Sequence, residues 1–230
     1  MNLLHTLSSA AVPAAASPAG SPAEGTGYDG AGIDGPAYLD VVHTAQDAPG
    51  WLDHAVSLYS SYGLAIFAVL MLYGWWSARA RGERERAVRA LAAPVLTVLA
   101  FVASTVVKSA VRELRPCHSL HVATLEACPA PDDWSFPSNH ATIAAAAAIA
   151  LWFVSVRLGV VASVCALAMA ASRVWVGAHY PHDVAVGLAV GALVALTLGL
   201  VVRALAPALA GRFGPLVRAG GPARTPGASA

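Results

Sequence analysis

Five apolar segments restrict this 230-residue chain to a helical membrane fold. They lie at residues 56–76, 90–107, 141–156, 158–174 and 184–205. A helical crossing of the hydrocarbon layer takes about 20 predominantly apolar residues. The third and fourth segments are joined only by a tight turn around Arg157 and Gly159, which predicts a helical hairpin. The expected fold is all-α, a compact polytopic bundle of about five transmembrane helices.

The composition supports a chain embedded in lipid. Charged residues make up only 12% of the sequence, against about 25% in an average soluble domain. Hydrophobic residues make up 57%. The frequent alanine, glycine and serine residues allow helices to approach one another closely in lipid. The net charge of +1 argues against a nucleic-acid partner, so the partner indicated is a membrane lipid.

The basic residues predict an orientation in the membrane. Most of them lie between spans one and two, between spans three and four, or after span five: Arg79, Arg81, Arg84, Arg86, Arg89, Arg157, Arg203, Arg212, Arg218 and Arg224. The positive-inside rule places these segments in the cytoplasm. The other basic residues lie at or near the two opposite loops: Lys108, Arg112, Arg115 and Arg173. We expect a multi-pass plasma-membrane protein with these loops on the external side.

The two ends of the chain differ from the spans in composition. Residues 1–50 are rich in Ala, Pro, Gly, Ser and Asp, contain no Lys or Arg and show no sustained period, which predicts a disordered tail. A cleaved export signal, or an amphipathic piece that packs on the membrane, is the alternative. We expect a membrane-embedded domain at residues 51–206 and a short cytoplasmic tail at residues 207–230.

Two of the three cysteines lie in one predicted external loop. Cys117 and Cys128 would meet oxidising conditions there and could form a disulfide. Two free thiols in a flexible loop are the alternative of equal weight. Cys165 lies inside the fourth span, where a small apolar filler is expected.

The first polar motif is a group of cations after the second span. Lys108, Arg112 and Arg115 are spaced i, i+4, i+7, so they share one face if the helix continues past the membrane. Pro116 would then end that helix. Lys108 is the only lysine in an arginine-rich chain, which indicates either a specific requirement or a chance codon. Such a stripe binds an anion or simply reaches lipid headgroups.

The second motif, residues 134–140 (WSFPSNH), leads into the third span. Its turn places Ser138 or Asn139 at the N-cap of a helix. Free backbone N–H groups and the positive end of the helix dipole favour an anion at that point. His140, in the first turn, would point at a bound anion. A purely structural cap is the simpler explanation when the motif is taken alone.

The third motif, residues 172–183 (SRVWVGAHYPHD), joins the fourth and fifth spans. Arg173 lies at the outer end of one span and Asp183 at the start of the next. A carboxylate that accepts the Nδ1 hydrogen of a histidine leaves Nε2 free as a nucleophile, and Asp183 is near enough to do this for His179. His182 is an alternative partner. An ordinary loop pair is the structural alternative.

Together the motifs resemble those of the type 2 phosphatidic acid phosphatase family, which is related to the vanadium haloperoxidases. That family has Lys, six residues, Arg-Pro; then Pro-Ser-Gly-His; then Ser-Arg, five residues, His, three residues, Asp. The matching residues here are Lys108, Arg115, Pro116, Pro137, Ser138, His140, Ser172, Arg173, His179 and Asp183. The order and internal spacing agree, and Asn139 stands where the family has Gly.

The resemblance implies a phosphatase mechanism without a metal or other cofactor. His179 would be the nucleophile that forms a phosphohistidine, Asp183 its orienting partner, and His140 the general acid and base. The phosphoryl oxygens would be held by Lys108, Arg115, Ser138, Asn139 and Arg173.

The resemblance also suggests the substrate. A polar residue in place of the motif Gly is frequent in relatives that act on undecaprenyl diphosphate, and an external site would suit recycling of the cell-wall lipid carrier. The expected product is undecaprenyl phosphate. Phosphatidic acid and phosphatidylglycerol phosphate are the alternative substrates. A vanadate-dependent haloperoxidase and a non-catalytic lipid-binding membrane protein are the more remote alternatives.

Overall fold

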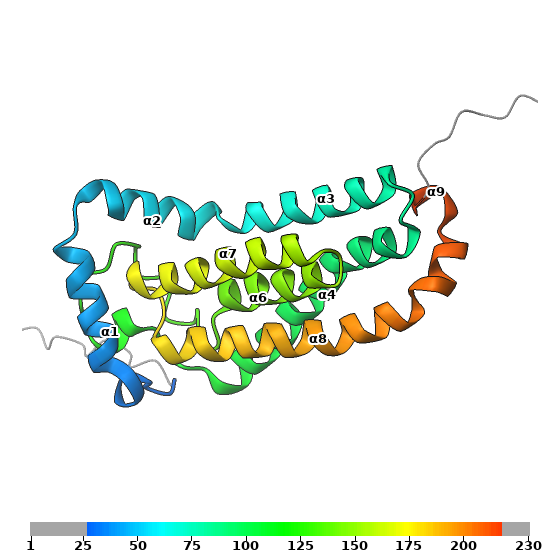
Figure 1. Ribbon diagram of the computed structural model, residues 1–230. Coiled ribbons are helices and arrows are strands. Elements are labelled where there is room, and N and C mark those ends of the chain that lie inside the picture. Colours follow the sequence, from blue (N-terminus) through cyan, green and yellow to red (C-terminus); the bar gives the residue numbers. More distant parts are fainter. Residues whose placement is uncertain (1–26, 218–230) are drawn as a thin grey trace, which may run out of the picture.

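The structure, a computed structural model, describes residues 27–217 as an elongated bundle of helices (Figure 1). The helices are α1 (Ala31–Gln46), α2 (Gly50–Tyr62), α3 (Leu64–Ala80), α4 (Arg84–Val111), α5 (Pro116–Ser119), α6 (Asn139–Trp152), α7 (Val156–Trp175), α8 (Pro181–Arg212) and α9 (Gly214–Val217). Within this part of the chain the β-structure is limited to a single bridge between Tyr28 and Glu113. The predicted all-α fold is confirmed.

Each predicted span corresponds to a helical segment, although not all are full crossings. Helices α4, α7 and α8 are long and apolar enough to cross a membrane, and α2 with α3 passes the same test as one span bent by 54°. Helix α6 is apolar but has only 14 residues, fewer than the roughly 20 that a crossing takes. Residues 27–217 therefore contain three long spans, or four with the bent pair.

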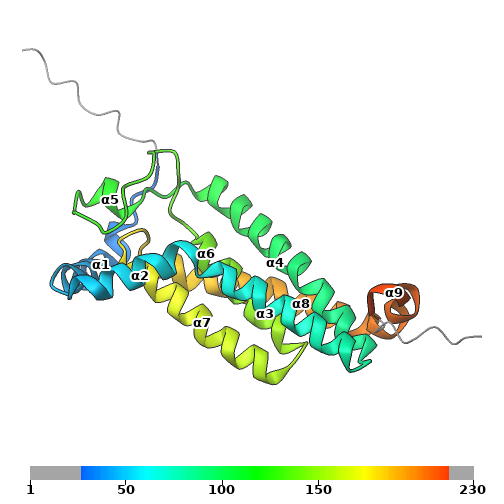
Figure 2. The same ribbon diagram turned by 90° about the horizontal axis from the view of Figure 1, so that it is seen from above.

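Helix α6 lies at the centre of the bundle and packs against α4, α7 and α8 (Figures 1 and 2). Its sequence is rich in alanine, and most of these alanines are fully buried. A helix that is apolar on all sides can be surrounded by others, and small side chains allow close approach. This packing places the N-terminus of α6 beside the first turn of α8.

Glycines on α8 permit its closest contact with α6. A Cβ at Gly187 would lie 2.6 Å from the carbonyl oxygen of Ser138, and one at Gly191 would lie 2.2 Å from that of Thr142. Both obstacles are backbone atoms, which cannot move aside as a flexible side chain can. The two glycines therefore set the distance between the helices that carry the second and third motifs.

The expectation of a disordered N-terminal tail is wrong for residues 31–46, which form α1. The buried side chains of Tyr38, Val42 and Ala45 lie on one side of α1, and Tyr38 packs against Tyr180 with ring centroids 5.3 Å apart. Pro36 lies inside the helix and Asp34 has non-helical φ/ψ, so no regular period marks α1 in the sequence. Residues 1–26 lie outside the described part of the chain.

Three local boundaries also differ from the prediction. The hairpin turn lies at residues 153–155, so Arg157 and Gly159 are inside α7. Helix α4 ends at Val111, and Pro116 begins the short α5 instead of ending a helix. Helix α8 continues to Arg212, because Ala206 and Ala210 pack in a core cluster that α3, α4 and α9 also line. Residues 218–230 of the expected tail lie outside the described residues.

We predict that Gly191→Ala destabilises the protein by about 1–3 kcal/mol, because the added methyl group meets the Thr142 carbonyl and separates α8 from α6. Thermal unfolding of the purified protein in detergent measures the effect. Gly211→Ala is the matched control on the same helix, since nothing lies within 4 Å of its added Cβ. Equal melting temperatures for the two variants would contradict this packing argument.

Candidate active site

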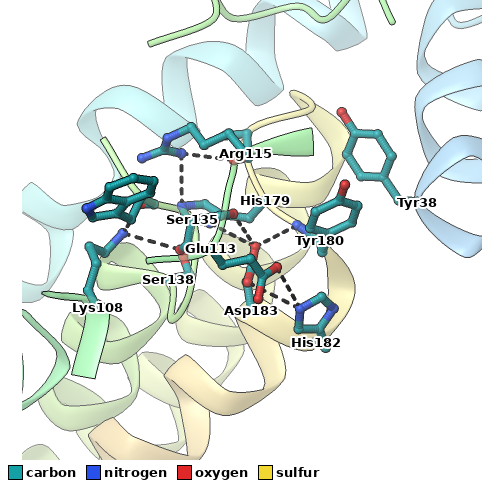
Figure 3. Close-up of polar contacts among 12 residues, drawn as sticks. Tyr38, Lys108, Glu113, Arg115, Ser135, Ser138, His179, Tyr180, His182 and Asp183 are labelled. Atoms are coloured by element: carbon teal, nitrogen blue, oxygen red, sulfur yellow. Dashed lines mark hydrogen bonds and ion pairs between the residues drawn. The ribbon is translucent and has the colours of Figure 1, made fainter. Parts of the chain in front are cut away.

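The three polar motifs meet at one end of the bundle, where backbone hydrogen bonds hold them together (Figure 3). The Ser135 N–H donates to the carbonyl of Glu113 at 2.7 Å, which joins the second motif to the first. The Ser138 N–H donates to the carbonyl of Asp183 at 3.0 Å, which joins the second motif to the third. The motifs are therefore parts of one site.

His179 and Asp183 form the buried centre of this site. Asp183 is fully buried in the first turn of α8, where its Oδ2 accepts hydrogen bonds from the Tyr180 N–H at 2.9 Å and from the Ser135 hydroxyl. The Nδ1 of His179 lies 3.4 Å from the same Oδ2 and 3.3 Å from the Ser135 hydroxyl. The predicted pair is thus in contact, with Ser135 between its two members.

The other ring nitrogen of His179 faces a cation. Its Nε2 lies 3.5 Å from the Arg115 guanidinium. The pKa of His179 is lowered to about 3, mainly by burial; the charges of Arg115 and Arg173 act in the same direction, and Asp183 opposes them. The imidazole is therefore neutral at physiological pH. A neutral ring whose Nδ1 proton is held by a carboxylate leaves the lone pair on Nε2.

Arg115 reaches the site from an extended segment and not from a helical stripe. The chain leaves α4 at Arg112, which has a left-handed backbone (φ 55°) and an exposed side chain. Arg115 donates from Nε to the Asp133 carbonyl, from NH1 to the Ala178 carbonyl and from NH2 to the Asp133 carboxylate. These bonds fix its guanidinium beside His179, while Arg112 points elsewhere.

Lys108 and Arg173 complete the cationic side of the site. The Lys108 ammonium donates to the carbonyls of Trp134 at 2.6 Å and Ser135 at 3.2 Å. Arg173 donates from NH1 to the Ser60 hydroxyl and to the Glu126 carboxylate, the latter at 3.0 Å. The Nε of Arg173 is buried without a partner. A buried unpaired donor is costly unless a ligand satisfies it, so Arg173 has capacity for an anion.

The N-terminus of α6 lies beside these cations. Ser138 is the N-cap, as predicted, and its buried hydroxyl has no partner. His140 is partly buried, and this burial is the main cause that lowers its pKa to about 4, with the positive charge of Arg173 acting in the same direction. The Asn139 side chain lies toward α4, where its Oδ1 accepts a hydrogen bond from Ser104 at 2.8 Å. The free N–H groups of this helix end and the Ser138 hydroxyl suit an anion.

Several polar residues of the site were missed by sequence reasoning. Ser135 lies inside the second motif and Glu113 inside the first, but no spacing rule singles them out. Asp34, Glu126 and Asp133 come from segments that the sequence presents as a tail and a loop. The sequence signal available for Glu113 was a carboxylate within a motif that otherwise carries cations.

Two groups in the described residues have potential metal ligands close together. Cys117 and Cys128 form a disulfide, which decides between the two alternatives for this loop and leaves no thiolate beside His118. The other group contains Glu113, His182 and Asp183. Both ring nitrogens of His182 already contact carboxylate oxygens within 2.9 Å, so this histidine is engaged in ion pairs.

The two histidines, the carboxylate and the cluster of cations lie in a part of the chain that matches a known protein family. The chain matches the family model described as the PAP2 superfamily over residues 89–206, which is slightly more than half of its length. The chain therefore belongs to the PAP2 superfamily, and its apolar helices make it a multi-pass membrane protein of that family.

Individual relatives match parts of the chain. Undecaprenyl-diphosphatase BcrC of Bacillus subtilis is 29% identical over 145 residues, 62% of this chain and 71% of the relative. Decaprenylphosphoryl-5-phosphoribose phosphatase of Mycobacterium tuberculosis (strain ATCC 25618 / H37Rv) is 40% identical over 107 residues, 45% of this chain and 55% of the relative. A lipid A 1-phosphatase of Rhizobium johnstonii is 48% identical over 69 residues, 29% of this chain and 28% of the relative.

A solved structure has the same fold. It is the transmembrane PAP2 type phosphatidylglycerolphosphate phosphatase from Bacillus subtilis, with a TM-score of 0.50 and 19% sequence identity. The match covers 78% of this chain and 87% of that protein. At this sequence identity, the similarity shows that the two proteins share an arrangement of helices.

We predict that Cys117→Ser lowers the free energy of unfolding by roughly 3 kcal/mol, because the disulfide closes a loop between residues 11 positions apart. Chemical denaturation under oxidising conditions measures the loss. Reductant should destabilise the wild-type protein by a similar amount and leave the variant unchanged. A variant as stable as the oxidised wild type would rule out a stabilising role for the bridge.

The neutral, buried His179 should make the fold sensitive to acid. Its pKa is about 3 in the folded protein against an ordinary value of 6.5. The contribution of the neutral ring to the free energy of unfolding is complete above pH 6.5. It is lost as pH falls toward 3, because His179 takes up a proton more readily in the unfolded chain. We expect the melting temperature to fall across this window, and to fall less steeply in His179→Gln. Parallel curves for the two proteins would contradict this assignment.

Proposed function

We propose that this protein is a metal-independent lipid phosphatase that removes the terminal phosphate of undecaprenyl diphosphate through a phosphohistidine intermediate. The observation that carries the proposal is the neutral His179, which has Asp183 at Nδ1 and the Arg115 guanidinium beside Nε2. A nucleophile that faces a fixed cation is placed where a phosphoryl group can be both attacked and stabilised.

The proposed reaction has two steps. In the first, Nε2 of His179 attacks the terminal phosphorus, and the bond from phosphorus to the bridging oxygen breaks. His140, protonated because the anionic substrate offsets the nearby cations, gives its proton to the leaving lipid phosphate. Asp183 stabilises the positive charge that develops on the ring through Nδ1–H. In the second step, His140 removes a proton from water and the water oxygen bonds to phosphorus. The bond from phosphorus to Nε2 of His179 breaks, inorganic phosphate leaves, and Nε2 regains its lone pair.

The remaining site residues would hold the phosphoryl oxygens. Lys108, Arg115 and Arg173 provide positive charge, and Ser138 provides a hydroxyl that has no other partner. Asn139 would contribute its backbone N–H at the helix end, because its side chain carbonyl is occupied by Ser104.

The substrate is inferred from the relatives. BcrC is named an undecaprenyl-diphosphatase, and a second relative with that activity in its name, from Sulfolobus acidocaldarius, is 35% identical over 95 residues. The mycobacterial relatives, at 38–40% identity, favour a second candidate, a polyprenyl phosphate ester with a sugar phosphate headgroup. Both candidates are polyprenyl lipids with a terminal phosphate.

The proposed site faces the external side of the plasma membrane. The arginine-rich connection between α3 and α4 and the α6–α7 turn lie at the opposite end of the bundle from the polar motifs (Figures 1 and 2). The positive-inside rule then places the motifs outside. We assign the catalytic domain to residues 51–206, to which α1 adds side chains at the polar end.

The first experiment is phosphate release by the detergent-purified protein in the presence of EDTA. We expect undecaprenyl diphosphate to be hydrolysed faster than phosphatidic acid, phosphatidylglycerol phosphate or decaprenylphosphoryl-5-phosphoribose. His179→Ala should lower the rate by at least about 10⁴-fold, because the covalent step is lost. His118→Ala, on the disulfide loop, is the matched control.

The outcomes separate the parts of the proposal. Faster hydrolysis of the sugar phosphate lipid would favour the second candidate, and preference for a glycerophospholipid would reject both polyprenyl substrates. Wild-type rates in a folded His179→Ala protein would disprove the nucleophile assignment. Activity that disappears in EDTA would disprove a reaction without a metal.

A further inference from the structure

His182 lies beside Asp183 and contacts two other carboxylates from distant parts of the chain. Its Nδ1 is 2.7 Å from Asp34 Oδ1, and its Nε2 is 2.9 Å from Glu113 Oε1. The backbone N–H of His182 also donates to Asp34 Oδ2 at 2.7 Å. Figure 3 shows the ring next to the Glu113 and Asp183 side chains. The second histidine of the HYPHD segment is therefore part of a network of acids.

The distances indicate the charge on the ring. A neutral imidazole has a single N–H donor, whereas an imidazolium has two. Both nitrogens of His182 face carboxylate oxygens, so the ring satisfies both contacts as a cation. The alternative is a neutral ring with its proton on Nδ1, whose Nε2 accepts a hydrogen bond from a protonated Glu113.

The surroundings of Glu113 require a positive charge nearby. Glu113 is 2% exposed and Asp183 is fully buried, and both carboxylates face the same ring nitrogen, since His182 Nε2 lies 3.6 Å from Asp183 Oδ1. The pKa of Glu113 is raised to about 7, mainly by burial and then by the Asp183 charge, against the opposing effect of His182. Two buried carboxylates without a cation between them cannot both stay ionised.

The backbone holds Glu113 in this position. Its carbonyl accepts the Ser135 N–H, and Tyr28 bridges to it in a parallel pair. A Cβ at Gly30 would lie 2.1 Å from Glu113 Oε1, so the segment before α1 packs directly on the carboxylate. This packing restricts the movement of the Glu113 carboxylate away from Asp183.

We propose that His182, as an imidazolium between Asp34 and Glu113, is a positioning residue that keeps Asp183 ionised and thereby keeps His179 oriented for attack. This inference rests on the proposed function, because that function assigns the roles of His179 and Asp183. Without the cation, the Glu113–Asp183 pair takes up a proton. The two carboxylates share this proton, with Glu113 as its donor, so Asp183 loses negative charge and becomes a weaker acceptor for the Nδ1 hydrogen of His179. The ring then loses its orientation.

Other groups face this network from each packed element. They are Asp34 from α1, Glu113 from the segment after α4, His179 and Tyr180 from the α7–α8 connection, and, across the site, Lys108, Arg115 and Arg173. The three cations across the site are held by their own carbonyl and carboxylate partners. His182 is the cation in direct contact with Glu113.

The test compares pH profiles of kcat in single and double variants. His182→Asn should lower kcat about tenfold or more with little change in KM, and should move the acid limb of the profile to higher pH. Glu113→Gln added to His182→Asn should recover much of the lost kcat, because it removes the competing carboxylate. His43→Asn, an exposed histidine on α1, is the matched control.

A purely structural role gives a different result. If His182 only anchors α1, the two substitutions should cause additive losses and the acid limb should stay in place, and this outcome would overturn the proposal. Recovery in the double variant with a shifted acid limb in the single variant would support it.

A measurement independent of activity separates this inference from the proposed function. ¹⁵N NMR of histidine-labelled wild-type protein, with His182→Asn to assign the signal, should show protons on both ring nitrogens of His182 at neutral pH. A single proton on the ring would overturn the inference. If the wild-type protein hydrolysed no lipid phosphate, the proposed function would fail, while the NMR result would still decide the charge of His182.

Discussion

The buried carboxylate of Asp183 is the group on which the polar end of the bundle depends. Its Oδ2 accepts hydrogen bonds from the Tyr180 N–H and the Ser135 hydroxyl, and it contacts His179. The backbone carbonyl of the same residue accepts the Ser138 N–H. A buried charge is tolerated only where such partners compensate its lost hydration. Residue 183 therefore joins the first turn of α8 to the loop that precedes α6.

The cations of the site depend on a second kind of partner. Lys108 is held by the carbonyls of the loop before α6, and Arg115 by the carbonyl of Ala178 and by Asp133. Arg173 is held by Glu126. Bonds of this kind fix each charge before a ligand arrives, so little reorganisation is needed when negative charge develops. The loop between α5 and α6 is thus a frame for the cations as well as a connection.

Much of the fold and part of the site could be predicted because they depend on local patterns. Long apolar runs are helical in lipid wherever they occur, since backbone polar groups must pair within the segment. The spacing from His179 to Asp183 brings the two together across the first turn of α8. The position of Arg115 was predicted wrongly, because Arg112 adopts a left-handed conformation and ends the helical stripe. Nothing in the residue spacing indicates that turn.

Helix α1 and the His182 network could not be predicted for a related reason. The contacts of α1 lie with residues far away in sequence: Tyr38 with the Gly177 carbonyl, and Asp34 with His182. Asn139 stands in the second motif as a change from Gly to a polar side chain, but its orientation depends on Ser104 of α4. A single sequence gives the residues that make such contacts but does not show which of them lie close together in space.

The sequence by itself determined the class of fold, the apolar segments and the three motifs, because hydrophobicity and short spacings act within one segment of chain. Apart from the pair formed by His179 and Asp183, only the tertiary structure decided which acids lie beside which bases. Packing of the alanine-rich α6 against α4, α7 and α8 brings the motifs together, and burial then makes each charge dependent on its neighbours. Some of those neighbours lie more than 60 positions apart in the chain, as with His182 and Glu113, separated by 69 positions.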